Sequence, residues 1–102
     1  MFELVFTQGA REQFDRIQSR ATGGKALGLL KQVAKALKLL RENPRHPGLA
    51  THVFTSLPNP YNAREKVFEA YAQNNTPAAY RIFWCYGPRA RQITVIAITP
   101  HP

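Results

Sequence analysis

Hydrophobic and polar residues alternate along this chain at two spacings, which predict helices up to residue 42 and strands mainly beyond residue 65. Ala10, Phe14, Ile17 and Ala21 recur every three to four residues with charged residues between them, and so predict an amphipathic helix. Residues 25–42 predict a second, longer helix with two adjacent apolar stripes and a narrow polar one. Because its apolar surface is so wide, we expect this helix to lie between a sheet and the first helix.

Runs of β-branched and aromatic residues predict four strands, at residues 3–6, 66–72, 80–86 and 92–99. Residues 73–77 and 87–91 are predicted loops. Residues 43–65 hold four of the eight prolines and predict a long irregular connection, with a short extended piece at residues 52–55. Loops of this length are often functional. The resulting order is β-α-α-β-β-β. It favours an α+β fold in which a helical hairpin packs on one face of a small, mostly antiparallel sheet.

Length and composition suit one domain that spans residues 1–102, with an ordinary 44% of hydrophobic residues. The sequence contains no apolar run long enough for a membrane span, and its first residues lack the basic start and apolar segment of a signal peptide. Cys85 is the only cysteine and lies within an aromatic strand. It predicts a buried thiol, and a chain without an internal disulfide fits a reducing, cytoplasmic location.

The charge balance is the strongest clue that composition offers. Fourteen lysines and arginines against six acidic residues give a net charge of +8 and a pI near 10.3. Such a charge favours a polyanionic or acidic partner, because the summed field attracts and holds ligands of that kind. The alternative is a basic protein whose charge serves solubility alone.

One permanently charged side chain, that of Arg81, lies inside the most apolar run of the chain, residues 78–86. Strand alternation puts Arg81 on the face opposite to Ile82 and Trp84. Burying an unpaired guanidinium costs several kcal/mol, so an arginine in this place is normally paired or faces a cleft. In an open cleft, Arg81 is suited to binding a phosphate with two parallel hydrogen bonds.

Polar residues on or beside the last three strands form the best candidate site, since no metal-ligand set, phosphate loop or nucleophile motif is present. Adjacent strands lie roughly 5 Å apart, so these side chains can converge on one patch of the sheet. The set comprises Lys66, Glu69, Tyr71, Arg81 and His101, with Arg45, His46, His52 and Arg64 in the long connection.

This group has the chemistry that RNA cleavage requires. The ribose 2′-hydroxyl is itself the nucleophile, so histidine or glutamate need only transfer protons while arginine holds the phosphoryl oxygens. Tyr71 or Phe83 can stack a splayed base. Structural alternatives remain open. Glu69 can pair with Lys66 or Arg81 across strands, Tyr71 can be packing, and His101 can be a frayed terminal residue. His46 and His52 are expected on the loop surface.

Three short motifs resemble those of the RelE/ParE toxin superfamily of bacterial toxin–antitoxin modules. They are Asn43-Pro44 followed by Pro47-Gly48, the strand Val67-Phe68-Glu69, and the strand Tyr80-Arg81-Ile82-Phe83-Trp84. The resemblance extends in order over nearly the whole chain. It implies that Arg81 contacts the scissile phosphate and that His101, after the last strand, is a catalytic histidine.

The leading hypothesis is therefore a cytoplasmic RelE-like toxin that cleaves ribosome-bound mRNA without a metal or other cofactor. Arg81 would bind the phosphate, His101 would be general acid or base, and Glu69 a second proton-transfer group. Arg45, Arg64, Lys66 and Tyr71 would hold the RNA, and an acidic antitoxin would neutralise the basic surface. Two alternatives stay open, a non-enzymatic ParE-like toxin that inhibits a topoisomerase and a diverged RNA-binding protein without toxicity.

Overall fold

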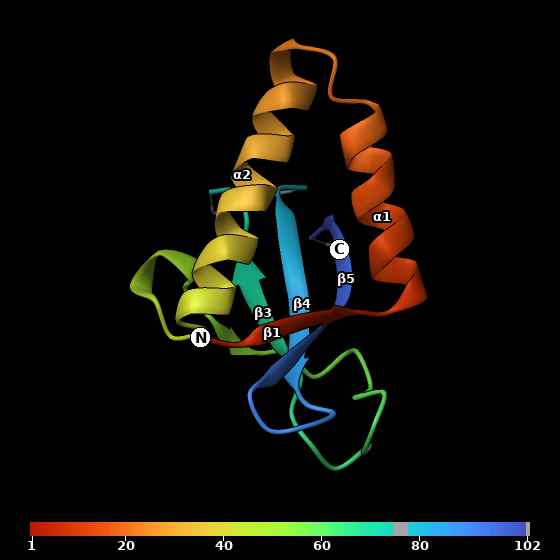
Figure 1. Cartoon of the computed structure of the whole chain (residues 1–102), viewed down its shortest axis with the longest axis vertical. Coiled ribbons are helices and arrows are strands. Elements are labelled where there is room, and N and C mark those ends of the chain that lie inside the picture. The colour runs from red at the N-terminus through yellow and green to blue at the C-terminus, as the bar shows by residue number, and fades with distance from the viewer. Residues whose placement is uncertain (75–77, 102) are drawn as a thin grey trace.

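The computed structural model describes residues 1–74 and 78–101 (Figure 1). Strand β1 (Glu3–Phe6) precedes the helices α1 (Gln8–Ser19) and α2 (Gly24–Glu42), which are followed by a 3-10 turn at Pro47–Leu49. The remaining strands are β2 (His52–Val53), β3 (Phe68–Tyr71), β4 (Tyr80–Tyr86) and β5 (Gln92–Pro100). The predicted order is confirmed, and the extended piece predicted in the long connection is strand β2. Residues 75–77 of the predicted loop at 73–77 lie outside the described residues.

The five strands within residues 1–74 and 78–101 form one sheet in the order β1-β5-β4-β3-β2. Strand β1 runs parallel to β5, and the other neighbouring pairs are antiparallel. The sheet is therefore mostly antiparallel, as predicted. The parallel pair joins the first and the last strand in the sequence, and the elements between them supply the long crossover that parallel neighbours require.

Local sequence signals set the helix boundaries. The Thr7 hydroxyl accepts a hydrogen bond from the Ala10 amide at 3.1 Å and so caps the first turn of α1. Gly24 has a φ of +58°, a conformation that glycine adopts without steric cost, and it allows α2 to begin directly after the tight connection. Asn43-Pro44 ends α2, because a proline cannot continue the helical hydrogen-bond ladder.

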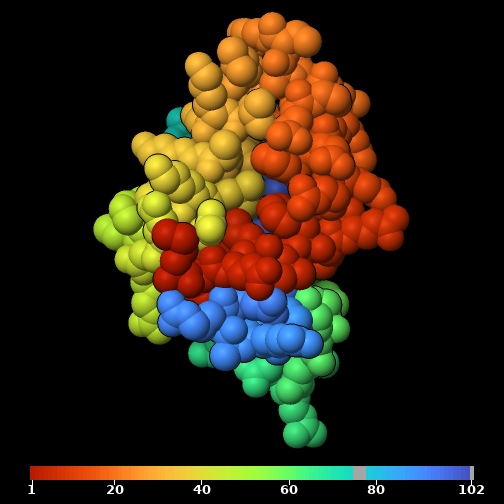
Figure 2. Space-filling view, viewed as in Figure 1, coloured from red at the N-terminus to blue at the C-terminus, as the bar shows by residue number. Residues whose placement is uncertain are grey.

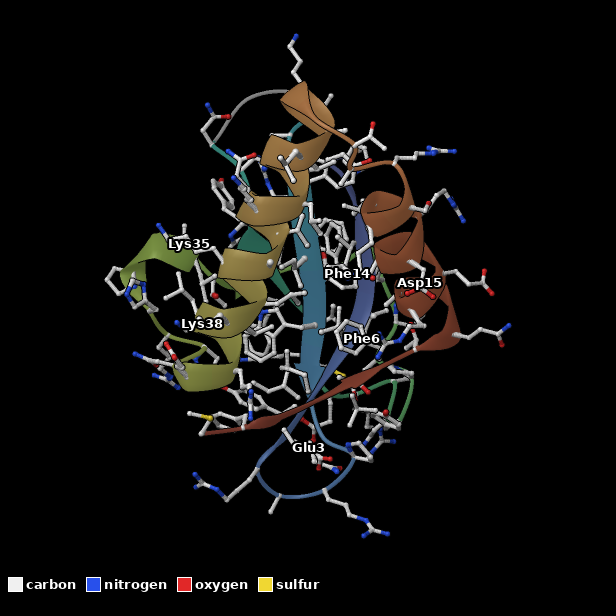
Figure 3. The ribbon with its side chains drawn as sticks, turned by 45° about the horizontal axis from the view of Figure 1, so that its top comes forward. Glu3, Phe6, Phe14, Asp15, Lys35 and Lys38 are labelled. Carbon is white, nitrogen blue, oxygen red and sulfur yellow. The ribbon has the colours of Figure 1, made fainter. Side chains whose placement is uncertain are left out.

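Helices α1 and α2 lie side by side on the same face of the sheet, so the expected layering of α2 between sheet and α1 is wrong (Figure 1). Ala10 and Ile17 of α1 and Val33 and Leu40 of α2 join one core with the strands. The wide apolar surface of α2 also packs against the 3-10 turn after it. Figure 2 shows the two helices and β1 covering this side of the molecule. In Figure 3, Phe6 and Phe14 lie together between β1 and α1, with their ring centroids 6.3 Å apart.

The other face of the sheet carries Arg81, Phe83 and Cys85, as strand alternation predicts. Residues of the long connection cover much of this face. The Phe54 ring lies 4.7 Å from that of Phe83, and the Tyr61 hydroxyl lies 2.8 Å from Oγ1 of Thr94. The predicted buried thiol is confirmed, because Cys85 is fully buried and burial raises the pKa of its thiol. No helix in the described ranges is long and apolar enough to cross a membrane.

Candidate functional site

Glu69 is the centre of a group of polar side chains on the sheet face opposite the helices. Its side chain is only 2% exposed. Oε1 lies 2.7 Å from Nε2 of His52, and Oε2 lies 2.6 Å from Nδ1 of His101. Nε of Arg81 lies 3.9 Å from the same Oε2 atom. We call Glu69, His52, His101 and Arg81, with the Tyr71 ring that covers the guanidinium, the Glu69 cluster.

Strand register explains how residues so distant in sequence meet. His52 of β2 stands directly opposite Glu69 of β3, and so the two side chains share a face. Arg81 of β4 stands opposite Tyr71, two residues beyond Glu69 on β3. His101 follows the end of β5, where its amide donates to the Ala79 carbonyl at 2.9 Å. Three strands and one strand end therefore build the site, as the sequence predicts for Glu69, Tyr71, Arg81 and His101.

Arg81 does not face an open cleft. Its side chain is 3% exposed, and the guanidinium carbon lies 4.0 Å from the centroid of the Tyr71 ring. One terminal nitrogen donates to the carbonyls of Asn74 and Tyr80, at 3.3 and 3.2 Å. Nε is buried with no hydrogen-bond partner in the part of the chain described. The sequence interpretation required an open cleft for Arg81 to bind a phosphate directly, and in this conformation the described part of the chain leaves none at its guanidinium. The alternative of pairing between Glu69 and Arg81 agrees with the geometry.

The two histidines are the accessible members of the cluster. The side chains of His52 and His101 are 47% and 42% exposed, whereas the carboxylate between them is buried. His52 also contacts the Ala50 carbonyl through Nδ1, at 3.0 Å. The expectation of a loop residue is therefore wrong for His52, which is exposed but belongs to β2 and contacts Glu69. The signal that could have found it is the predicted extended piece at residues 52–55, which pairs with the strand of Glu69.

The aromatic candidates for base stacking differ in access. Tyr71 is half-buried and lies on the Arg81 guanidinium, with its ring edge-on to that of His52 at 5.9 Å. Phe83 is 2% exposed and packed under Phe54, so it has no free face for a base. The prediction for Phe83 is wrong because the long connection, which looked structureless in sequence, covers it.

The remaining basic candidates lie outside the cluster. Arg45, Arg64 and Lys66 are exposed, and none of them forms an ion pair with Glu69 among the residues described. Arg45 borders a groove of about 450 Å³ that His52 also lines, but the strand residues of that groove, Phe68 and Trp84, belong to the sheet face that packs against the helices. Arg64 and Lys66 belong to the connection at the bottom of Figure 1.

The cluster combines two exposed imidazoles, those of His52 and His101, with the buried carboxylate and guanidinium of Glu69 and Arg81. His101 Nε2 has no hydrogen-bond partner in residues 1–74 and 78–101, and it can exchange a proton with a bound molecule. Within those same ranges, no group of three or more histidine, cysteine, aspartate and glutamate side chains is arranged to hold a metal ion.

Solved structures share this fold although their sequences have diverged widely. A YoeB/ParE toxin from Agrobacterium tumefaciens superposes with a TM-score of 0.68 at 11% identity, over 98% of this chain and 99% of the toxin. A copper-bound mutant toxin from Helicobacter pylori superposes with a TM-score of 0.62 at 12% identity, over 99% of this chain and 96% of that one. No protein-family profile and no curated protein sequence matches. The chain thus has the RelE/ParE toxin fold, as its motifs predict.

Proposed function

We propose that this chain, acting as one domain, is the toxin of a toxin–antitoxin module and a RelE-like endoribonuclease that cleaves ribosome-bound mRNA. The observation that carries the proposal is the exposed His101 ring, whose Nδ1 lies 2.6 Å from the buried Glu69 carboxylate. A histidine oriented in this way through one nitrogen presents the other to substrate, the arrangement that hydrolases use for proton transfer. The likeness to toxins over nearly the whole chain supports the biological role.

The chemistry is transesterification within RNA. The 2′-oxygen forms a bond to phosphorus while the bond from phosphorus to the 5′-oxygen breaks, which leaves a 2′,3′-cyclic phosphate and a 5′-hydroxyl. Nε2 of neutral His101 would accept the proton of the 2′-hydroxyl, and water would supply the proton to the leaving 5′-oxygen. Proton transfer by a positioned side chain contributes roughly 10²–10⁴-fold to rate.

Arg81 has two possible places in this reaction. In the structure, Nε of Arg81 lies 3.9 Å from Oε2 of Glu69, and the guanidinium stabilises the negative charge of that carboxylate. If it contacts the scissile phosphate, the covering Tyr71 ring must first move aside when RNA binds. Arg45, Arg64 and Lys66 would then hold the RNA backbone from the exposed parts of the connection between α2 and β3. The net charge of +8 suits both RNA and an acidic antitoxin, in a cytoplasmic setting.

The test is induced expression followed by mapping of transcript ends. The parent chain should produce cuts at defined codon positions, and His101→Ala should abolish them. Gln18→Ala is the control, because Gln18 is exposed on α1, which covers the sheet face opposite the Glu69 cluster. Fluorescence of Trp84, the only tryptophan, verifies that each variant is folded. Growth arrest with intact transcripts would refute ribonuclease activity.

One observation favours a second candidate, a ParE-like toxin that inhibits a topoisomerase without cutting RNA. The buried position of Arg81 removes the cation best suited to a scissile phosphate from the surface. A supercoiling assay with purified topoisomerase separates the two candidates. Inhibition of supercoiling that persists in His101→Ala, together with intact transcripts, would establish the second candidate in place of the first.

A further inference from the structure

The two ring nitrogens of His52 both face hydrogen-bond acceptors. Nδ1 lies 3.0 Å from the carbonyl oxygen of Ala50, which can only accept. Nε2 lies 2.7 Å from Oε1 of Glu69. A neutral imidazole carries one N–H and an ionised carboxylate carries none, so these two contacts require one additional proton. That proton lies either on His52, as an imidazolium, or on Glu69.

The surroundings of Glu69 favour the ionised carboxylate. Arg81 is permanently charged and lies 3.9 Å from Oε2, in a place where neither side chain is more than 3% exposed. A buried guanidinium without an anion would be strongly destabilising, so Glu69 supplies its counter-charge. His52 is 47% exposed, and water can solvate an imidazolium there. The 2.7 Å separation is typical of a charge-assisted bond from N⁺–H to O⁻. The additional proton is therefore placed on His52.

An ionised Glu69 then determines the tautomer of His101. Oε2 can only accept, so the Nδ1 atom that lies 2.6 Å away must carry the proton. When the ring is neutral, Nε2 presents its lone pair to solvent from a side chain that is 42% exposed. Both oxygens of Glu69 are hydrogen-bonded to histidines and its side chain is only 2% exposed, so the accessible His101 ring, and not Glu69, meets a substrate.

We propose that Glu69 is a positioning residue that fixes the Nδ1–H tautomer of His101, and that His52 is a further site residue that holds Glu69 ionised together with Arg81. The effect of this tautomer on RNA cleavage rests on the proposed function, whereas the assignment of the proton to Nδ1 of His101 does not. Under this proposal Glu69 is no longer the second proton-transfer group that the sequence suggested. His52, in the two-residue edge strand β2, then acts on the site only through its hydrogen bond to Glu69.

Long-range ¹⁵N–¹H correlation NMR on the full chain tests the tautomer directly. At a pH where the His101 and His46 rings are neutral, His101 should show a protonated Nδ1 and a bare Nε2. His46 is an internal control of opposite tautomer, since its Nδ1 accepts from the Gly48 amide at 3.0 Å. In Glu69→Gln, the amide offers one acceptor and one donor, so the Nε2–H form of His101 should become substantially populated. A bare Nδ1 on His101 in the parent chain overturns the proposal.

Transcript cleavage by Glu69→Gln supplies the second readout. With His101 intact, the rate should fall roughly 10²-fold or more. Glu42→Gln removes one exposed carboxylate at the end of α2, outside the proposed site, and should leave the rate unchanged. If Glu69→Gln cuts at the parental rate, the positioning role is overturned while the proposed function stands. If the parent cuts no RNA but His101 shows the expected tautomer, the proposed function fails and the positioning of His101 by Glu69 is upheld.

Discussion

At the residue scale, Arg81 and Glu69 illustrate why a charged residue in an apolar strand persists. The two charges are buried together, and each would be left uncompensated without the other. Removing one member of a buried ion pair typically costs about 3–5 kcal/mol, whereas replacing both by apolar residues is often neutral. The two residues therefore depend on each other. Their contribution to the free energy of unfolding can be measured only by changing them separately and together.

The variants Arg81→Met, Glu69→Leu and their combination measure this dependence. We expect each single variant to lose about 3 kcal/mol of unfolding free energy. The double variant should be more stable than either, because no buried charge is left unpaired. Urea unfolding followed by Trp84 fluorescence provides the values. Arg89→Met, in the exposed β4–β5 turn, is the control and should change stability by less than about 0.5 kcal/mol. Additive single effects would show that the pair is not coupled.

Cys85 gives the chain a predictable response to alkaline pH. Burial raises the pKa of this thiol above its ordinary value of 9.0, so the folded state keeps the proton longer than the unfolded state does. The stabilisation is thus fully present below the unfolded pKa and is lost as pH rises toward the folded pKa. As pH rises through the ordinary pKa of a thiol, the parent should lose more stability than Cys85→Ala. Equal losses in urea unfolding would contradict a buried neutral thiol.

At the element scale, local patterns predicted the helices and main strands well. Residues 3–6 and 80–86 were predicted with the bounds that the structure has, and α2 begins one residue earlier than predicted. What failed depended on contacts between distant segments. His52 and Glu69 are 17 residues apart, and their pairing rests on a strand of only two residues. The sequence predicted the extended piece at residues 52–55, but periodicity over so few residues does not identify the strand with which it pairs.

The connection between β2 and β3 shows the same limit. Its prolines predicted irregular backbone correctly, but its role as a cover for the second sheet face depends on particular side chains. Asn59, 7% exposed, accepts hydrogen bonds from the amides of Tyr61 and Asn62 and donates to the Lys66 carbonyl. These bonds fold the segment back onto the sheet. Composition alone cannot distinguish a covering loop of this kind from an open one, and the burial of Phe83 followed from it.

Tyr61→Phe tests how firmly this connection is held on the sheet. The Tyr61 hydroxyl is bonded to Oγ1 of Thr94, whose own hydroxyl donates to the Gly87 carbonyl. Removing the first bond should cost about 1 kcal/mol in unfolding free energy. Tyr86→Phe is the matched control, because Tyr86 is similarly exposed and its hydroxyl has no hydrogen bond within the described ranges. Indistinguishable unfolding curves for the two variants would mean that the bond to Thr94 does not anchor the connection.

At the scale of the whole molecule, the sheet separates two basic surfaces. Helix α2 carries lysines on its outer side, where Figure 3 shows Lys35 and Lys38. Arg64 and Lys66 belong to the connection that covers part of the other face, where the Glu69 cluster lies. A net charge of +8 by itself attracts RNA to either surface. The proposed function requires that the RNA be held on the side of His101.

Matched charge reversals distinguish these surfaces. Arg64→Glu with Lys66→Glu and, separately, Lys31→Glu with Lys38→Glu both lower the net charge from +8 to +4, because each reversal changes it by two units. Affinity for a single-stranded RNA is measured by fluorescence anisotropy at several salt concentrations. Removing one cation that binds a phosphate reduces the salt slope by about 0.7, so the first pair should reduce it by roughly 1.4 and the second hardly at all. Equal reductions would mean that RNA responds only to the total charge. A larger reduction by the α2 pair would place the RNA on the helical face, away from His101, and would remove the physical basis for cleavage at the Glu69 cluster.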